Sequence, residues 1–431
     1  MPSAVAKGSS FMPRPPVYSG DGTSDAVPGG RTDASFSPSV RTSAEVHGHV
    51  KRICFKTGPP RLVGAELEWI VAYASDPHAG VPVSQVQEAL GAAGPLPGRS
   101  LLTFEPGGQL ELSSRPVTGL SACWQALAAD VDHLRDAFAG TGLTLSTTAI
   151  DPFRPPQRQL ADPRYVGMET YFDRRGQTGR VMMCSTAALQ VNLDSGIDAP
   201  DVARRWKLLH AIGPPLVAAF ANSPIYAGRV TGWKSTRQAV WRRLDPYRTA
   251  PPIGPDPTAA WAEYAIDAPV MVVRGDGDAW TPDPGFTFGE WMAGADDGRP
   301  TYDDLDYHLS TLFPPVRPRG WLEVRYIDAQ SLVYWPVPIA ALTALVEHPE
   351  AGEAAATAAR PVAAAWMRAA RCGLDDPDLA RAALGCFDAA IAALPDVGAD
   401  PALVDLVREF RDRYVARRSC PADDHLQKGA V

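Results

Sequence analysis

Apolar and polar positions alternate along several short segments of the chain, and this pattern predicts β-strands. Each segment is apolar or alternating and is bounded by Gly, Pro or Asp. A strand with one buried face requires such alternation, because successive side chains point to opposite faces of a sheet. The strands that we predict cover residues 61–73, 101–113, 180–194, 268–274 and 320–328.

Helical spacing appears between and after these segments. From about Thr118 to Ala139, large apolar residues recur every three or four positions, and two glycines follow. The last hundred residues are rich in Ala and also carry helical spacing. Strands followed by a helical end favour an α+β fold over a doubly wound one. The other helices that we predict cover residues 200–221, 338–347, 352–371, 377–393 and 401–417.

Composition divides the chain into three parts. Residues 1–45 are rich in Ser, Gly, Pro and Asp and poor in large apolar residues. Such a segment cannot bury enough surface to offset the entropy of ordering, so we predict a disordered tail. A catalytic domain over 46–347, with its body starting near Arg61, and a helical C-terminal subdomain over 348–431 complete the prediction.

Charge and motif content exclude several classes of protein. The 431 residues include 41 Lys and Arg against 49 Asp and Glu, which argues against nucleic-acid binding. No uninterrupted apolar stretch is long enough to span a membrane, and no secretory signal is visible, so we expect a cytoplasmic protein without a membrane partner. The six cysteines form no CxxC pair, and neither a dinucleotide fingerprint nor a P-loop follows a strand.

The first informative acids lie in the apolar segment GAELEW. Glu66 and Glu68 are two residues apart and therefore share one face of a strand. Two like charges side by side repel each other, although a solvated strand face tolerates them. A bound metal cation would convert the repulsion into binding. The motif alone leaves both interpretations open.

A second pair of acids lies in TFEPGGQLELS. Glu105 and Glu111 would lie ~20 Å apart on one straight strand. The intervening Pro106-Gly107-Gly108 is a turn signal, and a reversal there would bring the two acids together. A simple surface hairpin tip is the alternative.

Polar residues also interrupt two later strands. Gln190 and Asn192 lie on one face between apolar neighbours, and an amide oxygen is an acceptable ligand for a hard cation. Hydrogen bonding within a polar face is the alternative. Glu323 and Arg325 share a face of the last strand, either as a structural ion pair or as part of a site.

Two arginines flank a tryptophan in STRQAVWRRLDPYR. Arg237 and Arg248 lie on either side of Trp241. Arginine forks suit carboxylate and phosphate oxygens, whereas a solvated arginine-rich surface is the alternative. Together the strands supply more carboxylates than one Mg²⁺ needs. The set fits two or three Mg²⁺ ions, or Mn²⁺, clamped around a polyphosphate.

These motifs resemble, in the same order, those of the plant and bacterial type of glutamate–cysteine ligase. The resemblance covers about residues 61–347 and is most specific in TFEPGGQLELS and STAALQVNLD. It implies a glutamine-synthetase-like fold, in which a curved, mostly antiparallel sheet forms a bowl. The metal positions that it implies are Glu66, Glu68, Glu105, Glu111, Gln190 and Glu323. The catalytic residues that it implies are Arg237, Arg248 and Arg325, and Arg237, Arg248, Gln190 and Asn192 are expected to bind substrate.

The resemblance also implies an activity. ATP would phosphorylate the γ-carboxylate of L-glutamate, and the α-amine of L-cysteine would displace phosphate to give γ-glutamylcysteine. The branch it most resembles is the actinobacterial one, which feeds ergothioneine synthesis. We expect a monomer or homodimer. The alternatives are a ligase of the same superfamily with another amine acceptor, a metal-dependent phosphohydrolase and a non-catalytic relative.

Overall fold

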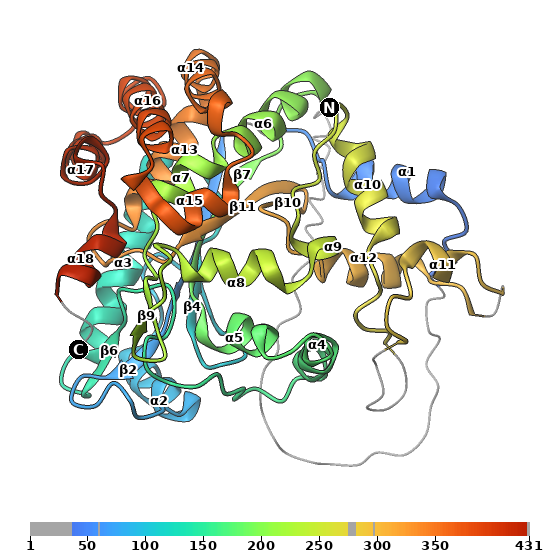
Figure 1. The fold of residues 1–431 in the computed structure, drawn as a ribbon, viewed down its shortest axis with the longest axis horizontal. Helices are drawn as coiled ribbons and strands as arrows, with labels where there is room; N and C mark the ends of the chain where they lie inside the picture. The colour runs from blue at the N-terminus through green and yellow to red at the C-terminus, as the bar shows by residue number, and fades with distance from the viewer. Residues whose placement is uncertain (1–36, 59–60, 275–281, 296–297, 429–431) are drawn as a thin grey trace, which may run out of the picture. The chain divides into compact units, whose positions relative to one another are not determined.

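The computed structural model describes residues 37–58, 61–274, 282–295 and 298–428. Its centre is a sheet in which every strand pairing is antiparallel. The strand order is β10-β11-β7-β1-β4-β3, with β5 paired to β1. Figure 1 labels β10, β11, β7 and β4 of this sheet. The predicted α+β class and mostly antiparallel sheet are therefore confirmed. The strands are β1 (Leu62–Trp69), β3 (Leu101–Phe104), β4 (Leu110–Ser113), β5 (Val117–Thr118), β7 (Ala188–Asp194), β10 (Val316–Pro318) and β11 (Trp321–Asp328).

The two faces of this sheet differ in chemistry. We call the face that packs on the hydrophobic core the outer face and the opposite, polar face the inner face. On the outer face, Leu67, Leu112 and Val191 are almost fully buried. They belong to the main hydrophobic core together with residues of α3 (Leu120–Phe138) and α13 (Pro336–Glu347). The inner face carries the acids and amides that the sequence singles out. The alternation of the strands thus separates the core from the polar face, as predicted.

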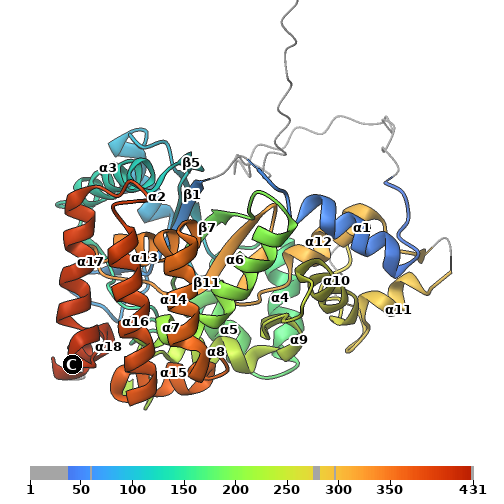
Figure 2. The same ribbon diagram turned by 90° about the horizontal axis from the view of Figure 1, so that it is seen from above.

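Helices complete the remainder of the fold. In the C-terminal region, α16 packs against both α13 and α14 (Figure 2). Its apolar residues share one core with the sheet, and the described residues from Pro38 onward form one compact unit. The predicted boundary at residue 348 therefore does not separate two compact units. These C-terminal elements are α14 (Pro349–Ala359), η2 (Arg360–Val362), α15 (Trp366–Cys372), η3 (Gly373–Asp375), α16 (Pro377–Ala393), α17 (Pro401–Arg413), η4 (Val415–Arg417) and α18 (Pro421–Gln427).

The remaining elements are short and surround the sheet. No helix among the residues in the described ranges combines the length and apolar character needed to cross a membrane. These elements are α1 (Ser43–Ile53), α2 (Val83–Ala93), α4 (Pro163–Asp173), α5 (Thr178–Ser185), α6 (Ala199–Ala211), α7 (Gly213–Ala219), α8 (Thr236–Leu244), α9 (Pro246–Thr249), α10 (Pro257–Asp267), α11 (Phe288–Met292) and α12 (Tyr302–Ser310), with the two-stranded pairs β2 (Val71–Tyr73) and β6 (Leu143–Leu145), and β8 (Ile225–Tyr226) and β9 (Arg229–Val230).

Several predicted elements are corrected by the structure, among them the following three. The strand predicted over 180–194 is helix α5 followed by β7, because a short apolar run such as VMMC fits a buried helix as well as a strand. The segment 268–274 forms only an isolated bridge, between Pro269 and Thr287. The helix predicted over 200–221 is broken at Ile212, where prolines 214 and 215 supply no backbone N–H.

The N-terminal prediction is corrected in part. Residues 1–36 lie outside the described residues. Val40, which we assigned to the tail, is fully buried, and its N–H donates to the Pro300 carbonyl at 2.7 Å. Thr42 and Glu45 then form a capping box at the start of α1. The tail boundary near residue 45 is therefore wrong, because composition does not reveal a single buried valine in a polar segment.

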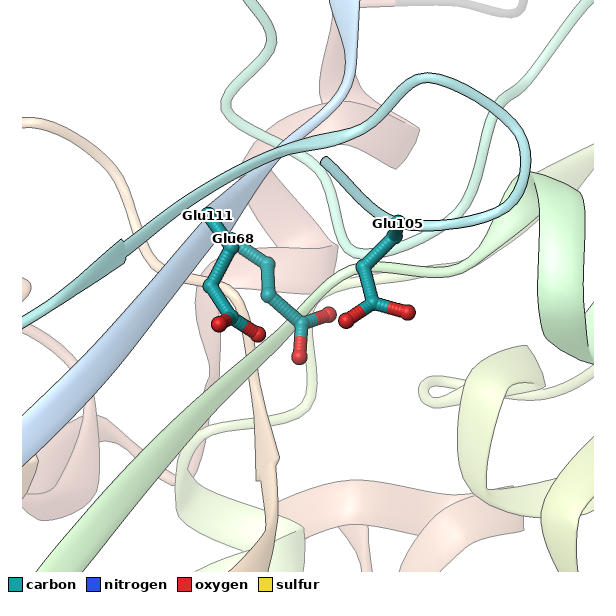
Figure 3. Close-up of side chains that lie close together, drawn as sticks. All are labelled: Glu68, Glu105 and Glu111. Carbon is teal, nitrogen blue, oxygen red and sulfur yellow. The ribbon is translucent and has the colours of Figure 1, made fainter. Parts of the chain in front are cut away.

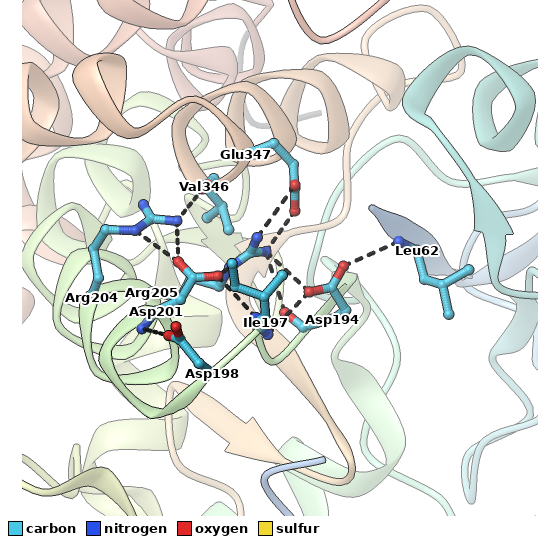
Figure 4. A network of polar contacts seen from close by, with 10 residues as sticks. Leu62, Asp194, Ile197, Asp198, Asp201, Arg204, Arg205, Val346 and Glu347 are labelled. Carbon is cyan, nitrogen blue, oxygen red and sulfur yellow. Dashed lines mark hydrogen bonds and ion pairs between the residues drawn. The ribbon is translucent and has the colours of Figure 1, made fainter. Parts of the chain in front are cut away.

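An ion-pair network fastens the end of β7 to two helices (Figure 4). The buried Arg205 guanidinium on α6 contacts Asp194 at 3.3 Å, Asp201 at 2.9 Å and Glu347 at 2.5 Å. Asp194 also accepts the Leu62 N–H at 3.2 Å. Since removing one member of a buried pair is strongly destabilising, this network fixes the strands that carry the polar face.

Candidate active site

The β3–β4 hairpin brings two distant acids together, as predicted. The Glu105 N–H donates to the Gln109 carbonyl at 2.9 Å, and the Gly108 N–H donates to the Glu105 carbonyl at 2.8 Å. Gly108 has a φ of 87°, which favours glycine. A Cβ on Gly107 would lie 2.3 Å from the Cys184 carbonyl oxygen, so a side chain does not fit there. The Pro-Gly-Gly sequence is thus a tight reversal held against α5.

Strand register then aligns the polar residues on one face. Glu68 lies opposite Glu111 across β1 and β4. Glu66 lies opposite Gln190 across β1 and β7, and Asn192 lies opposite Glu323 across β7 and β11. Directly opposed residues in antiparallel strands point to the same side. Alternation in four strands therefore gathers these groups on the inner face.

Three carboxylates form the centre of the site. One oxygen each of Glu68, Glu105 and Glu111 lies within 4.8 Å of the others, and Figure 3 shows the three side chains pointing toward one another. We call this group the glutamate trio. Burial raises the pKa of each carboxyl, and for Glu105 the charges of the other two raise it well above its ordinary value. No salt bridge links the trio to a cation within the described part of the chain.

Neighbouring groups hold the trio in place. The hydroxyls of Thr103 and Ser113 both donate to Glu111 Oε1 at 2.9 Å, and the Ala188 N–H donates to Glu68 Oε2 at 2.7 Å. The trio thus offers positioned oxygen atoms and an unbalanced negative charge. Hard divalent cations such as Mg²⁺ prefer oxygen ligands of this kind, so the donor set fits such an ion.

Glu323 has the opposite environment on the same face. Arg317 makes two hydrogen bonds to its carboxylate, at 2.6 and 3.1 Å. Arg319 and Arg325 add one each, at 3.1 and 2.8 Å. Although burial acts to raise it, the three guanidinium charges hold the pKa of Glu323 well below its usual range. Glu323 here is the counter-charge of three arginines, and its role as a metal ligand stays a prediction.

Glu66 lies between these two environments. Burial and the charges of Glu323 and Glu111 raise the pKa of Glu66 to about 7. The Asn192 amide donates to Glu66 Oε1 at 3.0 Å and accepts the Trp321 indole N–H at 3.1 Å. Asn192 is thus a link between an aromatic side chain and an acid.

Gln190 makes a second link of this type. Its Nε2 donates to Glu68 Oε1 at 3.0 Å, and its Oε1 accepts from Arg325 Nη1. Because an arginine offers only donors, the amide oxygen must face Arg325. The arrangement therefore favours Gln190 as a bridge between Glu68 and Arg325, in contrast to the predicted metal ligand.

Arg237 lies beside this face, as predicted. Its buried guanidinium donates from Nη2 to the Arg325 carbonyl at 3.0 Å and lies 3.6 Å from Asp328. With Trp241 and Phe313, the two arginines line a small pocket. Within the described residues, Arg237 Nη1 and the Trp241 indole N–H have no hydrogen-bond partner. Arg237 Nη1 is the atom that lies 3.6 Å from Asp328, whereas the Trp241 indole N–H leaves a donor for a bound substrate.

The C-terminal helices brace the start of the helix that carries Arg237. The Ser235 N–H donates to the Ala370 carbonyl of α15 at 2.8 Å. The Lys234 ammonium binds Asp375 at 3.0 Å and also Asp423 of α18. We call these contacts the Lys234 brace. Residues far apart in the sequence therefore fix the entry into α8.

Arg248 corrects a prediction. Its fully buried side chain donates from Nη1 to the Thr311 carbonyl and hydroxyl, both at 3.0 Å, and from Nη2 to the Pro269 carbonyl. Its Nε lies 3.3 Å from Asp245, and its guanidinium stacks 4.7 Å from the Tyr171 ring centre. The protein itself occupies these donors, so Arg248 supports the fold and does not bind substrate here.

Sequence reasoning missed Arg317, Arg319 and Trp321. The signal was present in VRPRGWLEVR. A turn at Gly320, where φ is 87°, folds β10 onto β11 and places Arg317 opposite Glu323. Alternation alone puts Trp321 on the face of Glu323. A hairpin interpretation of this motif would have found all three.

The sequence of the chain matches a known family and several known proteins. Residues 62–429 match the family model for glutamate–cysteine ligase family 2 (GCS2). The chain is 41% identical to glutamate–cysteine ligase EgtA of Mycolicibacterium smegmatis over 93% of this chain and 99% of the relative. It is 42% identical to EgtA of Mycobacterium tuberculosis over 86% and 87%, respectively. A solved structure of glutamate–cysteine ligase from Francisella tularensis in complex with AMP has a TM-score of 0.49 and 13% identity, covering 86% of this chain and 85% of that one. By its family match and these relatives, the chain belongs to glutamate–cysteine ligase family 2.

Proposed function

We propose that this protein joins the γ-carboxylate of L-glutamate to the α-amine of L-cysteine at the expense of ATP, giving γ-glutamylcysteine, ADP and phosphate. The observation that carries the proposal is the inner sheet face, where a glutamate trio without a salt bridge in the described structure lies beside an arginine-rich region. The family and its EgtA relatives support the same reaction. The expected destination of the product is ergothioneine synthesis.

The reaction needs an activated carboxyl group. The γ-carboxylate attacks the terminal phosphorus of ATP, the bond to the bridging oxygen breaks, and γ-glutamyl phosphate and ADP form. The cysteine amine then attacks the acyl carbon, phosphate leaves with the C–O electron pair, and the amine loses a proton. Phosphoryl transfer depends on positioning and charge neutralisation more than on protein nucleophiles, so the scattered cysteines need no role.

The glutamate trio, with Glu66 beside it, would hold Mg²⁺. Such a metal would supply positive charge that offsets the negative charge of the ATP phosphates. The chain's own contribution is to fix the carboxylates through Thr103, Ser113 and the Ala188 N–H before substrates arrive. Groups that are already in place need no reorganisation during the reaction.

The arginines would act on the substrates. Nη1 of Arg325 donates to both Glu323 and Gln190, so Nε and Nη2 are the donors that would meet a phosphoryl group. The Arg237 guanidinium, whose Nη1 lies 3.6 Å from Asp328, and the Trp241 indole N–H line the same pocket and would hold the α-carboxylate of glutamate. A guanidinium fork suits a carboxylate better than an ammonium does.

The deciding experiment measures ADP release by the full chain with Mg²⁺ and ATP, with and without glutamate, across a panel of amines. We expect release to require both glutamate and cysteine. A different best amine would identify a related ligase, and ATP turnover without glutamate would contradict the proposal in favour of a phosphohydrolase. Glu105→Gln should lower kcat by about a thousand-fold, whereas Glu88→Gln, at an exposed position on α2, is the matched control.

A further inference from the structure

Trp321 stands out on the inner face because it is a large, partly exposed aromatic residue among charged groups. It begins β11 and shares a face with Glu323 and Arg325. Its exposed fraction is 37%, whereas that of Trp69, on the outer face of β1, is 2%. The Trp321 ring is therefore accessible to a ligand on a face that is otherwise polar.

The indole ring is nevertheless held in place. Its N–H donates to Asn192 Oδ1 at 3.1 Å, and the Arg319 guanidinium lies 5.3 Å from the ring centre. A ring that is fixed before binding loses little freedom when a ligand stacks on it. Trp321 therefore has the properties of a preformed platform for a flat group.

Arg319 gives the platform a charged edge. It donates to Glu323 Oε1 at 3.1 Å, and its side chain is 43% exposed. An arginine has five donors, and its fork matches phosphate geometry. The pair thus offers an aromatic surface for a ring and a cation for a phosphate oxygen close to each other.

We propose that Trp321 and Arg319 form the subsite for the base end of the nucleotide. This inference rests on the proposed function. Of its three substrates, glutamate and cysteine carry no aromatic ring, and ATP alone carries a flat one, the purine. The ligand class is therefore a purine nucleoside triphosphate, with its base on the Trp321 ring and a phosphate oxygen near Arg319.

The order of residues along β11 agrees with this placement. Glu323 follows Trp321 by two residues and Arg325 by four, which correspond to about 7 and 13 Å along a strand. A nucleotide extended along the strand would pass from the base at Trp321, past Glu323 and Glu66, to the reacting phosphoryl near Arg325. The Arg237–Trp241 pocket, which contains Arg325, then receives glutamate at the far end.

The test separates the base from the phosphates. The two probes are ATP and tripolyphosphate, which has the phosphate chain without the base. Trp321→Ala should raise the KM for ATP by roughly 5- to 150-fold, the range given by base–aromatic stacking. The inhibition constant of tripolyphosphate and the KM for glutamate should change less than about two-fold, because neither ligand touches the ring. Tyr247→Ala, which removes an aromatic ring that is 55% exposed on α9, is the control and should change none of these constants.

Trp321→Phe distinguishes the ring from its N–H. The variant keeps an aromatic face and loses the donor to Asn192. Its KM for ATP should therefore lie closer to the wild-type value than that of Trp321→Ala does, and its inhibition constant for tripolyphosphate should stay near that of wild type. Equal losses in Trp321→Phe and Trp321→Ala, together with weaker tripolyphosphate binding, would overturn the proposal, because Trp321 would then act through Asn192 on Glu66. Unchanged KM for ATP in Trp321→Ala would overturn it as well. If Trp321→Ala does not fold, Trp321→Leu provides bulk without a π system and carries the same expectation.

Direct binding keeps this inference separate from the proposed function. Calorimetric titration of the full chain with Mg²⁺ and a non-hydrolysable ATP analogue reports the subsite without turnover. Weaker binding in Trp321→Ala than in wild type supports the subsite even if the enzyme uses another amine. If the wild type shows ligase activity but Trp321→Ala binds the ATP analogue as tightly as the wild type does, the proposed function stands and the Trp321 subsite is rejected.

Discussion

The glutamate trio and Glu323 lie on the same inner face of the sheet, but only Glu323 forms salt bridges in the described structure. The glutamate trio has hydroxyl and amide neighbours but no salt-bridge partner in the described structure. Glu323 has three arginines. The pKa values accordingly move in opposite directions, upward in the trio and downward at Glu323.

The difference shows that burial does not decide the charge of an acid on its own. Burial acts to raise the pKa in both environments, yet nearby guanidinium groups reverse its effect at Glu323. In the trio, Arg237 and Arg325 act to lower the pKa of Glu68, and Arg325 acts to lower that of Glu105, but burial outweighs them. A face with one internally neutralised acid and three open ones is suited to bind metal and phosphate in separate places.

The largest effect on activity is expected from removing one carboxylate of the trio. Glu105→Gln keeps the shape of the side chain and removes one charge, so it should lower kcat by about a thousand-fold, since bound metal supplies several kcal/mol of transition-state stabilisation. Steady-state ADP release at saturating Mg²⁺ measures this. Glu88→Gln on α2 serves as the surface control, and near-normal kcat in Glu105→Gln would show that the trio does not hold the catalytic metal.

The next effect concerns the internal charge balance at Glu323. Arg317→Leu should lower the free energy of unfolding by about 3–5 kcal/mol, because it leaves a buried carboxylate short of its main partner. Arg319→Gln removes a half-exposed partner of the same acid, so its cost should stay below about 1 kcal/mol. Urea denaturation measures both. Similar losses in the two variants would mean that the three arginines share the charge equally.

A smaller effect separates the two predicted arginines. Arg237→Lys should reduce kcat/KM for glutamate by roughly 10- to 150-fold, the value of a lost charge-assisted hydrogen bond. Arg248→Lys should lower the melting temperature and leave kcat/KM close to that of wild type, since Thr311, Pro269 and Asp245 surround that guanidinium. Equal loss of activity in the two variants would return Arg248 to the active site.

The smallest effect is a dependence of stability on pH. Burial and like charges raise the pKa of Glu66 from its ordinary value of 4.5 to about 7. Between pH 4.5 and about 7, the Glu66 carboxyl binds more protons in the folded protein than in the unfolded chain. The contribution of Glu66 to the free energy of unfolding therefore falls as pH rises. Mg²⁺ should offset this loss, and the melting temperature difference between Mg²⁺-loaded and chelator-treated protein should therefore widen from pH 5 to pH 7.5.

The raised pKa values of Glu68, Glu105 and Glu111 add to the same widening, because these carboxyls would bind Mg²⁺ as well, whereas titrating groups elsewhere cancel. Burial lowers the pKa values of His210 and His308, but these imidazoles affect both samples equally and cancel in the difference. Glu323 keeps its charge over the whole window, because its pKa lies below it. In Glu66→Gln, the melting temperature difference between Mg²⁺-loaded and chelator-treated protein should grow less with pH than in wild type. A wild-type difference that stays constant with pH would contradict the raised pKa.

The sequence predicts the parts of this site that depend on local rules. Alternation placed Glu66 and Glu68 on one face, and Pro-Gly-Gly predicted the reversal that returns Glu111 to Glu105. Local rules do not show which partner a charged group meets across the fold. The sequence pattern therefore predicts Arg248 to bind a ligand, whereas in the fold Thr311 and Pro269 accept its hydrogen bonds. The apolar run 180–185 was ambiguous between helix and strand, and the structure decides it through packing.

The Lys234 brace has a consequence for building chimaeras of this enzyme with its relatives. The C-terminal helices look like an exchangeable module in the sequence, yet Asp375 and Asp423 bind the residue that precedes α8 by two positions. A transplant that carries different residues at these positions would release the α8 entry and with it the orientation of Arg237. The natural unit of exchange therefore runs across the apparent module boundary and includes residue 234 together with its two distant acids.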